Sequence, residues 1–174
     1  MNSKFWNACR VLAVCVAVGV SAPSWSRAAE GEEYKSEVAA FTGVQRLPGL
    51  TKPMIGGSIG TAVGTNSMLF FEPSYVALGS GVKLVNLLGG LNIGFTTQNP
   101  KLVPYLSLVG GLGRFSGGGE SEHDPVYGAG FGVRYFVGSN WGIKPEFRWQ
   151  RYQAEDGGNT YVFKAGVFYR FGSR

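Results

Sequence analysis

The segment from Tyr161 to Phe171 alternates strictly between two kinds of side chain. One set of positions carries aromatic and aliphatic residues, and the intervening set includes Lys164 and Arg170. Successive side chains of a β-strand point to opposite sides of the backbone, so a period of two predicts a strand. Because one face is aromatic and the other tolerates charge, the segment must belong to a sheet with two different environments.

The same alternation recurs through most of the chain. From Ser36 onward it predicts eight strands, at about 36–46, 53–64, 67–78, 81–96, 102–115, 126–137, 141–153 and 160–171. In the seventh, Trp141, Phe147 and Trp149 share one face, and Lys144, Glu146 and Arg148 share the other. The first, second and fifth strands are too glycine-rich or too evenly apolar for their faces to be assigned. Consecutive strands joined by turn signals predict an all-β, eight-stranded antiparallel up-and-down barrel.

The N-terminus has the pattern of a secretory signal peptide. Lys4 and Arg10 precede a short apolar run, and Ser26 and Ala28 occupy the −3 and −1 positions of a cleavage site. The apolar run is about ten residues, whereas a spanning helix needs roughly 20. We therefore expect four parts, namely a signal peptide at 1–28, a short segment at 29–35, the barrel at 36–171 and a tail at 172–174.

The composition is that of a protein exposed to lipid. Charged residues make up 16% of the chain, below the roughly 25% of soluble domains, although no apolar run reaches 18 residues. Both cysteines, Cys9 and Cys15, lie in the predicted signal peptide, so we expect no disulfide, no Cys-based metal site and no cofactor. Removing that peptide leaves 13 of the 16 basic residues against 11 acidic ones, which gives no footprint for nucleic acid.

Periodicity alone does not say which face points outward. A lipocalin-like soluble barrel would turn its apolar face inward and cover its outside with long charged residues. Here the polar faces are mostly Gly, Ser and Asn, which suit a crowded interior. Aromatic residues also fall at both ends of the last three strands, as in the two girdles of a membrane barrel. The predicted periplasmic girdle contains Trp141, Tyr135 and Phe171, and the predicted outer girdle contains Trp149, Tyr127 and Tyr161.

The connections suggest an orientation in a bacterial outer membrane. Compact turn signals occur at 64–66, around 98–100 and at 138–140, and we place them with both termini on the periplasmic side. Longer outer loops are expected at 46–52, 116–125 and 154–159, with a very short one near 79–81. Two of the outer loops are acidic, and one of them contains Glu155 and Asp156.

The segments 127–136 and 138–149 resemble the penultimate hairpin of the OmpA/OmpX-type outer-membrane β-barrel family. Pro104-Tyr105 and a final strand ending in Phe171 also fit, although three residues follow where many relatives stop. The resemblance implies outer-membrane lipids, lipopolysaccharide and the barrel-assembly machinery as partners. It leaves the function open, because the family spans structural proteins, adhesins and porin-like solute pores.

Charged residues on the inward faces would have to pair inside a narrow barrel, since an unpaired buried charge costs several kcal/mol. We expect them to fill the lumen as a salt-bridge plug, with Glu146 pairing to Lys164, although a charged gate of a narrow solute pore is an alternative. This set comprises Glu72, Arg134, Lys144, Glu146, Arg148, Lys164 and Arg170.

His123 is the only histidine of the chain. A lipid A-modifying hydrolase is a second alternative, but Pro125 and Val126 follow where the deacylase pattern would need a serine. We therefore expect a non-enzymatic envelope protein with a structural or surface-interaction role and an unidentified extracellular ligand. The acidic residues Glu120, Glu122 and Asp124, together with His123, form a candidate for a weak cation site.

Overall fold

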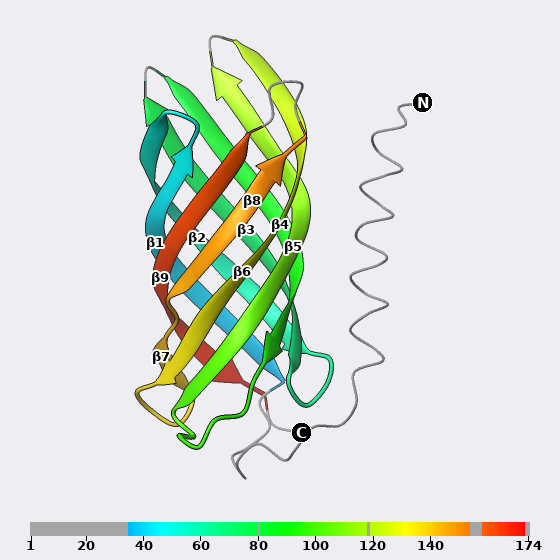
Figure 1. Cartoon of the computed structure of the whole chain (residues 1–174), viewed down its shortest axis with the longest axis vertical. Helices are drawn as coiled ribbons and strands as arrows, with labels where there is room; N and C mark the ends of the chain where they lie inside the picture. Colours follow the sequence, from blue (N-terminus) through cyan, green and yellow to red (C-terminus); the bar gives the residue numbers. More distant parts are fainter. Residues whose placement is uncertain (1–34, 80, 118, 154–157, 173–174) are drawn as a thin grey trace.

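Nine β-strands form a single antiparallel sheet that closes into a barrel (Figure 1). This computed structural model describes residues 35–79, 81–117, 119–153 and 158–172, so the predicted signal peptide lies outside the described residues. Within these ranges the strands are β1 (Ser36–Leu47), β2 (Leu50–Ala62), β3 (Ser67–Gly79), β4 (Val82–Gly94), β5 (Leu102–Gly117), β6 (Glu120–Phe136), β7 (Trp141–Ile143), β8 (Glu146–Tyr152) and β9 (Asn159–Phe171).

The nine strands occupy eight positions around the barrel. β7 and β8 both lie between β6 and β9, and they are separated by Lys144 and Pro145. The backbone stays bonded to its neighbours across this interruption, because Lys144 N donates to Gly166 O and Val133 N donates to Pro145 O. Pairing of β1 with β9 closes the ring. The predicted eight-stranded up-and-down barrel is therefore confirmed, with its seventh strand broken at a proline.

The pairing register fixes how strongly the strands tilt. A row of paired residues starts at Asn159 on β9 and returns to that strand at Tyr169 after passing Arg151, Tyr127, Gly110, Gly89, Phe71, Ile59 and Val38. The two positions on β9 are ten residues apart (169 minus 159), and this stagger is the shear of the barrel. Barrels of this kind tilt their strands by roughly 40°.

Side chains alternate between the lumen and the outside along every strand. In β9, Val162, Lys164 and Phe168 are buried in the interior, whereas Phe163 and Val167 are exposed on the outside. The exposed large apolar residues come from strands all around the barrel, whereas most of the buried ones share the lumen with charged groups. The apolar face therefore points outward, which rules out the lipocalin-like arrangement.

The connections differ from the prediction at the end opposite the described termini. β1 runs to Leu47 and β2 begins at Leu50, so the expected loop at 46–52 is reduced to two residues. The expected loop at 116–125 is mostly strand, because β5 extends to Gly117 and β6 begins at Glu120. Residues 154–157 of the third expected loop, including Glu155 and Asp156, lie outside the described residues, and Asn159 is already in β9.

The connections at the other end match their predicted positions. They occupy 63–66, 95–101 and 137–140, and the segment 95–101 is longer than the two-residue turns opposite. Among the connections that the structure describes in full, the expected contrast between short periplasmic turns and long outer loops is not present. Loop length consequently gives no support for the membrane orientation.

Within the part of the chain that the structure describes, no helix has the length and apolar character needed to cross a membrane.

Candidate functional site: the charged lumen

Four buried charged residues meet in the middle of the barrel, and we call them the central cluster: Glu72, Glu146, Arg148 and Lys164. Arg148 Nη1 lies 2.9 Å from Glu72 Oε1, and its guanidinium also pairs with Glu146. Lys164 Nζ pairs with Glu72 and lies 3.5 Å from Glu146 Oε2. Each carboxylate therefore contacts both cations, which offsets the cost of removing all four charges from water.

The barrel topology brings these residues together from opposite walls. Glu72 is on β3 and Arg148 is on β8, and four steps around the eight positions separate the two strands. Glu146 and Lys164 are instead direct register partners on β8 and β9. Side chains from facing walls therefore meet in the centre, where they cross the full width of the lumen.

Tyr105 on β5 completes the central cluster. Its hydroxyl donates a hydrogen bond to Glu146 Oε2 at 2.9 Å. Its ring lies under the guanidinium of Arg134, whose central carbon is 4.6 Å from the ring centroid. A buried aromatic ring beneath a desolvated cation stabilises that charge without needing another carboxylate. Tyr105 thus links the central cluster to the charges nearer the termini.

Those charges form a lower cluster around Glu37 on β1. Its carboxylate accepts from Arg134 Nε at 2.9 Å, from Lys144 Nζ at 3.0 Å and from Arg170 Nε at 3.2 Å. Glu37, Arg134 and Lys144 are buried or nearly so, and Arg170 is partly exposed towards the barrel end. One carboxylate therefore joins cations from β6, β9 and the β7–β8 junction.

An uncharged upper cluster lies towards the opposite end. Tyr152 accepts a hydrogen bond from Gln45 Nε2 at 2.8 Å and donates one to Asn86 Oδ1 at 2.9 Å. Apolar side chains pack around this group and form the buried core: Phe41, Met54, Val76, Leu84, Leu88, Val126 and Val162. Besides its two charged clusters, the lumen thus contains a layer of neutral hydrogen bonds and apolar packing, and Asp124 of β6 is also buried towards this end.

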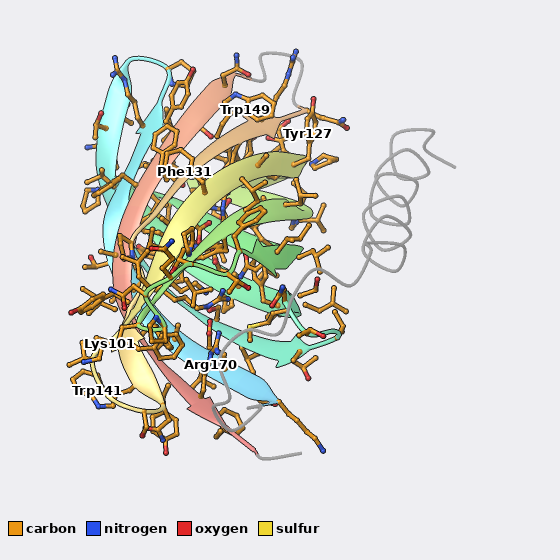
Figure 2. All side chains as sticks on the ribbon, turned by 60° about the horizontal axis from the view of Figure 1, so that its bottom comes forward. Lys101, Tyr127, Phe131, Trp141, Trp149 and Arg170 are labelled. Atoms are coloured by element: carbon orange, nitrogen blue, oxygen red, sulfur yellow. The ribbon has the colours of Figure 1, made fainter. Side chains whose placement is uncertain are left out.

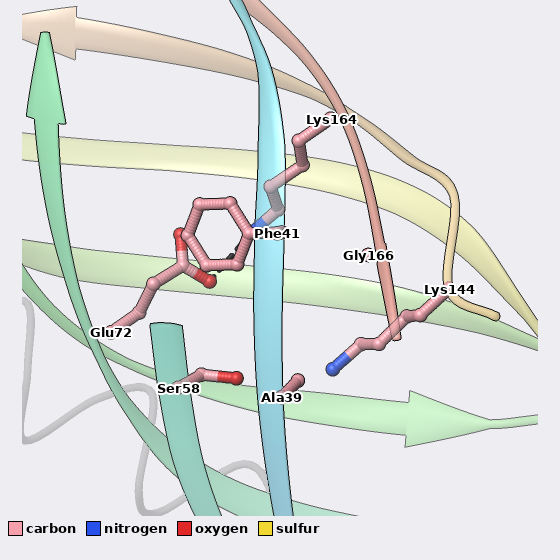
Figure 3. Close-up of a pocket in the computed structure, with 7 residues that line it drawn as sticks. All are labelled: Ala39, Phe41, Ser58, Glu72, Lys144, Lys164 and Gly166. Atoms are coloured by element: carbon pink, nitrogen blue, oxygen red, sulfur yellow. Dashed lines mark hydrogen bonds and ion pairs between the residues drawn. The ribbon is translucent and has the colours of Figure 1, made fainter. Parts of the chain in front are cut away.

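Little space remains beside the central cluster. A cavity of about 10 Å³ is lined by Phe41, Glu72, Lys144 and Lys164 (Figure 3). Figure 3 shows the ammonium group of Lys164 directed past the Phe41 ring, at 4.4 Å from its centroid, towards Glu72. A cavity needs at least about 10–15 Å³ to hold one water molecule. At this level the side chains themselves fill the interior.

The structure brings together all seven charged residues that the sequence analysis assigns to the lumen. Each faces inward and forms at least one of the ion pairs described above. Glu37 is the residue that sequence reasoning missed. Glu37 lies on the same face of β1 as Gln45, and exposed Val38 and Val44 lie on the opposite face. Applying the alternation of strand side chains to β1 would therefore have placed Glu37 in the lumen.

The segment expected to form a cation site has a different structure. Residues 120–124 belong to β6, where His123 is exposed and Asp124 is buried on the opposite face. Among the described residues, no group of three or more His, Cys, Asp or Glu side chains is placed to hold a metal ion. We therefore do not propose a cation site there.

The residues assigned to the aromatic girdles lie on the outside of the barrel. Figure 2 shows Tyr127 and Trp149 near one end and Trp141 near the other. Tyr127 and Trp149 pack edge to face with their centroids 6.1 Å apart. Tyr161 is the register partner of Trp149, and Trp141 pairs with Tyr169.

Several solved structures share this fold. Neisserial surface protein A has 17% identity and a TM-score of 0.65, over 79% of this chain and 97% of that chain. The N-terminal β-barrel domain of Pseudomonas aeruginosa OprF has 21% identity and a TM-score of 0.56, over 80% of this chain and 99% of that one. This chain has the fold of a small outer-membrane β-barrel.

The fold is shared with an enzyme as well. The outer membrane enzyme PagL has 13% identity and a TM-score of 0.54, over 78% of this chain and 99% of that chain. No protein-family model matches the chain, and no curated protein matches it in sequence. Small outer-membrane barrels thus share this architecture while differing in activity, so function has to be argued from the side chains.

Proposed function

We propose that this chain is a non-enzymatic barrel of the bacterial outer membrane, of the OmpA/OmpX type, with a closed lumen and a structural or surface-interaction role. The observation that carries the proposal is the pair formed by Glu72 and Arg148, which joins opposite walls through the middle of the lumen. Breaking such a pair would leave an uncompensated charge in a buried site. The interior therefore acts as a fixed plug.

Closure of the lumen leaves the outer surface as the part of the molecule that can act. The outward face carries exposed large apolar side chains from strands all around the barrel, which suits lipid acyl chains. At the end opposite the described termini, β2, β4 and β6 each begin three residues after the preceding strand ends. We place that end outside the cell. The start of the first strand at Ser36 and the end of the last strand at Phe171 then lie on the periplasmic side.

Conductance across a planar lipid bilayer tests the closed lumen. We expect the purified, inserted protein to show no discrete current steps. A double variant, Glu72→Ser with Arg148→Ser, removes the pair that crosses the lumen and should pass more current than the unmodified barrel. Discrete steps from the unmodified barrel would overturn the plug in favour of the narrow pore.

An enzymatic role is tested by the mass of lipid A. If the barrel is non-enzymatic, membranes with and without the protein should contain lipid A of the same mass. A loss of acyl groups that depends on the protein would contradict the non-enzymatic assignment.

A further inference from the structure

The charged side chains at outward-facing strand positions are all cations. Among the outward-facing positions of the described strands, four are charged: Arg46 on β1, Lys83 on β4, Arg114 on β5 and Arg151 on β8. All four are exposed, and none forms an ion pair with a residue that the structure describes. In contrast, Glu37, Glu72 and Glu146 of the described strands point into the lumen.

The four cations lie at one level, although they come from strands all around the barrel. At a tilt of roughly 40°, one step to the next strand along a paired row changes the height by about 3 Å, and one residue along a strand changes it by about 2.5 Å. With the row from Asn159 to Tyr169 as the reference, all four fall within about 6 Å of one another in height. We call these four residues the cationic belt.

The belt lies just beyond the outer aromatic girdle. The same geometry places it, on average, about 6 Å farther from the barrel centre than Tyr127, Trp149 and Tyr161. Two direct pairings show the proximity, since Arg46 is the register partner of Tyr161 and Arg151 is that of Tyr127. Aromatic belts mark the interface between acyl chains and headgroups. The next layer outward contains the charged parts of the headgroups.

Part of the belt lines a groove on the outside of the sheet. A depression of about 460 Å³ at the ends of β4, β5 and β6 is lined by Lys83, Arg114, Ser116 and Ser121, with Glu120 also at the groove. Lys83 and Ser116 are register partners, as are Ser116 and Ser121. Two cations beside two hydroxyl donors provide the charge-assisted hydrogen bonds that phosphate oxygens accept.

We propose that the cationic belt binds phosphate groups of lipid headgroups in the leaflet around this end of the barrel, with the groove at Lys83 and Arg114 as its principal site. The proposal rests on the proposed membrane location. Lipid is the occupant because the belt faces sideways at headgroup level, next to apolar surface that would contact acyl chains. An anionic lipid headgroup and a row of unpaired cations are complementary in charge, and binding should weaken as salt increases.

The test compares nanodiscs of phosphatidylcholine that contain a minor fraction of spin-labelled lipid A, with its phosphates present or removed. We expect the barrel to immobilise the phosphorylated form preferentially. In the variant Lys83→Gln with Arg114→Gln, the relative association constant should fall by about fivefold for each cation removed, or about 30-fold for both. Lys101→Gln, which removes an exposed cation at the opposite end, should leave the constant unchanged.

The outcomes separate this inference from the proposed membrane location. Failure to insert into any bilayer would overturn both. If the barrel inserts but does not prefer the phosphorylated lipid, lipid binding by the belt is wrong and the membrane location stands. The same holds if the Lys83/Arg114 variant prefers that lipid as strongly as the unmodified barrel does. Inorganic phosphate is added to a further sample to test whether the free ion competes with the lipid for the site. If it competes at concentrations equal to those of the lipid, the site is one for free phosphate and the lipid assignment is wrong.

Discussion

Glu146 is the carboxylate with the most varied set of partners in the lumen. It contacts Arg148 and Lys164 and accepts a hydrogen bond from Tyr105. Arg148 retains Glu72 if Glu146 is lost, but two cations would then share one carboxylate. A buried charge left with incomplete compensation destabilises the folded state far more than an exposed one.

We predict that Glu146→Ala lowers the free energy of unfolding by about 3–5 kcal/mol, as expected for breaking a buried ion pair. Urea unfolding of the barrel in detergent or lipid vesicles measures the change. Glu122→Ala is the matched control, because Glu122 is exposed and should change stability by less than about 0.5 kcal/mol. Equal stability of the two variants would show that the central cluster does not hold the lumen together.

At the residue level, the sequence separates the two faces most clearly where charged residues alternate with aromatic ones. Lys144, Glu146 and Arg148 were assigned to the lumen because Trp141 and Trp149 flank them at the opposite parity. Glu37 was missed because small residues at 39, 40 and 43 weaken the contrast between the two faces of β1. The pairing of Glu37 with three cations also depends on β1 lying next to β9, which is a property of ring closure and not of local sequence.

At the scale of elements, the seam between β1 and β9 depends on a close approach at Gly166. A Cβ atom on this residue would lie 2.2 Å from Ala40 O and 2.7 Å from Phe41 Cβ on β1. The contact with Ala40 involves backbone, so a side chain at this position forces the two strands apart. Because this pairing closes the barrel, a local clash there affects the whole ring.

We predict that Gly166→Val destabilises the barrel by at least the 1–3 kcal/mol that is typical of overpacking. The folded fraction is measured from the faster electrophoretic migration of unheated barrel. Ala165→Val adds bulk to the neighbouring residue, which is exposed on the outside, and should fold like the unmodified chain. Normal folding of both variants would mean that the β1–β9 seam tolerates separation.

Strand positions followed from periodicity, whereas strand ends at the outer side did not. The run Ser116 to Gly119, followed by acidic residues, has the composition of a loop. In the structure the β5–β6 ladder continues to the pair Gly117 and Glu120, and Gly119 adopts a φ of 89°, a backbone conformation that glycine reaches without strain. Glycine at such a position permits either a tight turn or a loose loop, so composition could not distinguish them.

At the scale of the whole molecule, the account requires that the apolar face contacts lipid and the charged face is enclosed. Sequence periodicity defined the two faces of each strand. The scarcity of charged residues favoured a barrel whose apolar face points outward over one whose apolar face points inward. Membrane orientation was less predictable, since two of the expected long outer loops are replaced by strands, with β2 and β6 beginning three residues after β1 and β5 end. The cationic belt became visible only when the register placed residues from four separate strands at one height.

The most direct measurement of this central claim compares two adjacent residues of β3. Phe70 is 8% exposed in the lumen, and Phe71 is 48% exposed on the outside. In a chain beginning at residue 29 and carrying Trp141→Phe and Trp149→Phe, Phe70→Trp and Phe71→Trp each introduce a single tryptophan. In vesicles with brominated acyl chains, we predict strong fluorescence quenching at position 71 and little at position 70. Equal quenching at both positions, or stronger quenching at position 70, would contradict an outward apolar face around a closed, charged lumen.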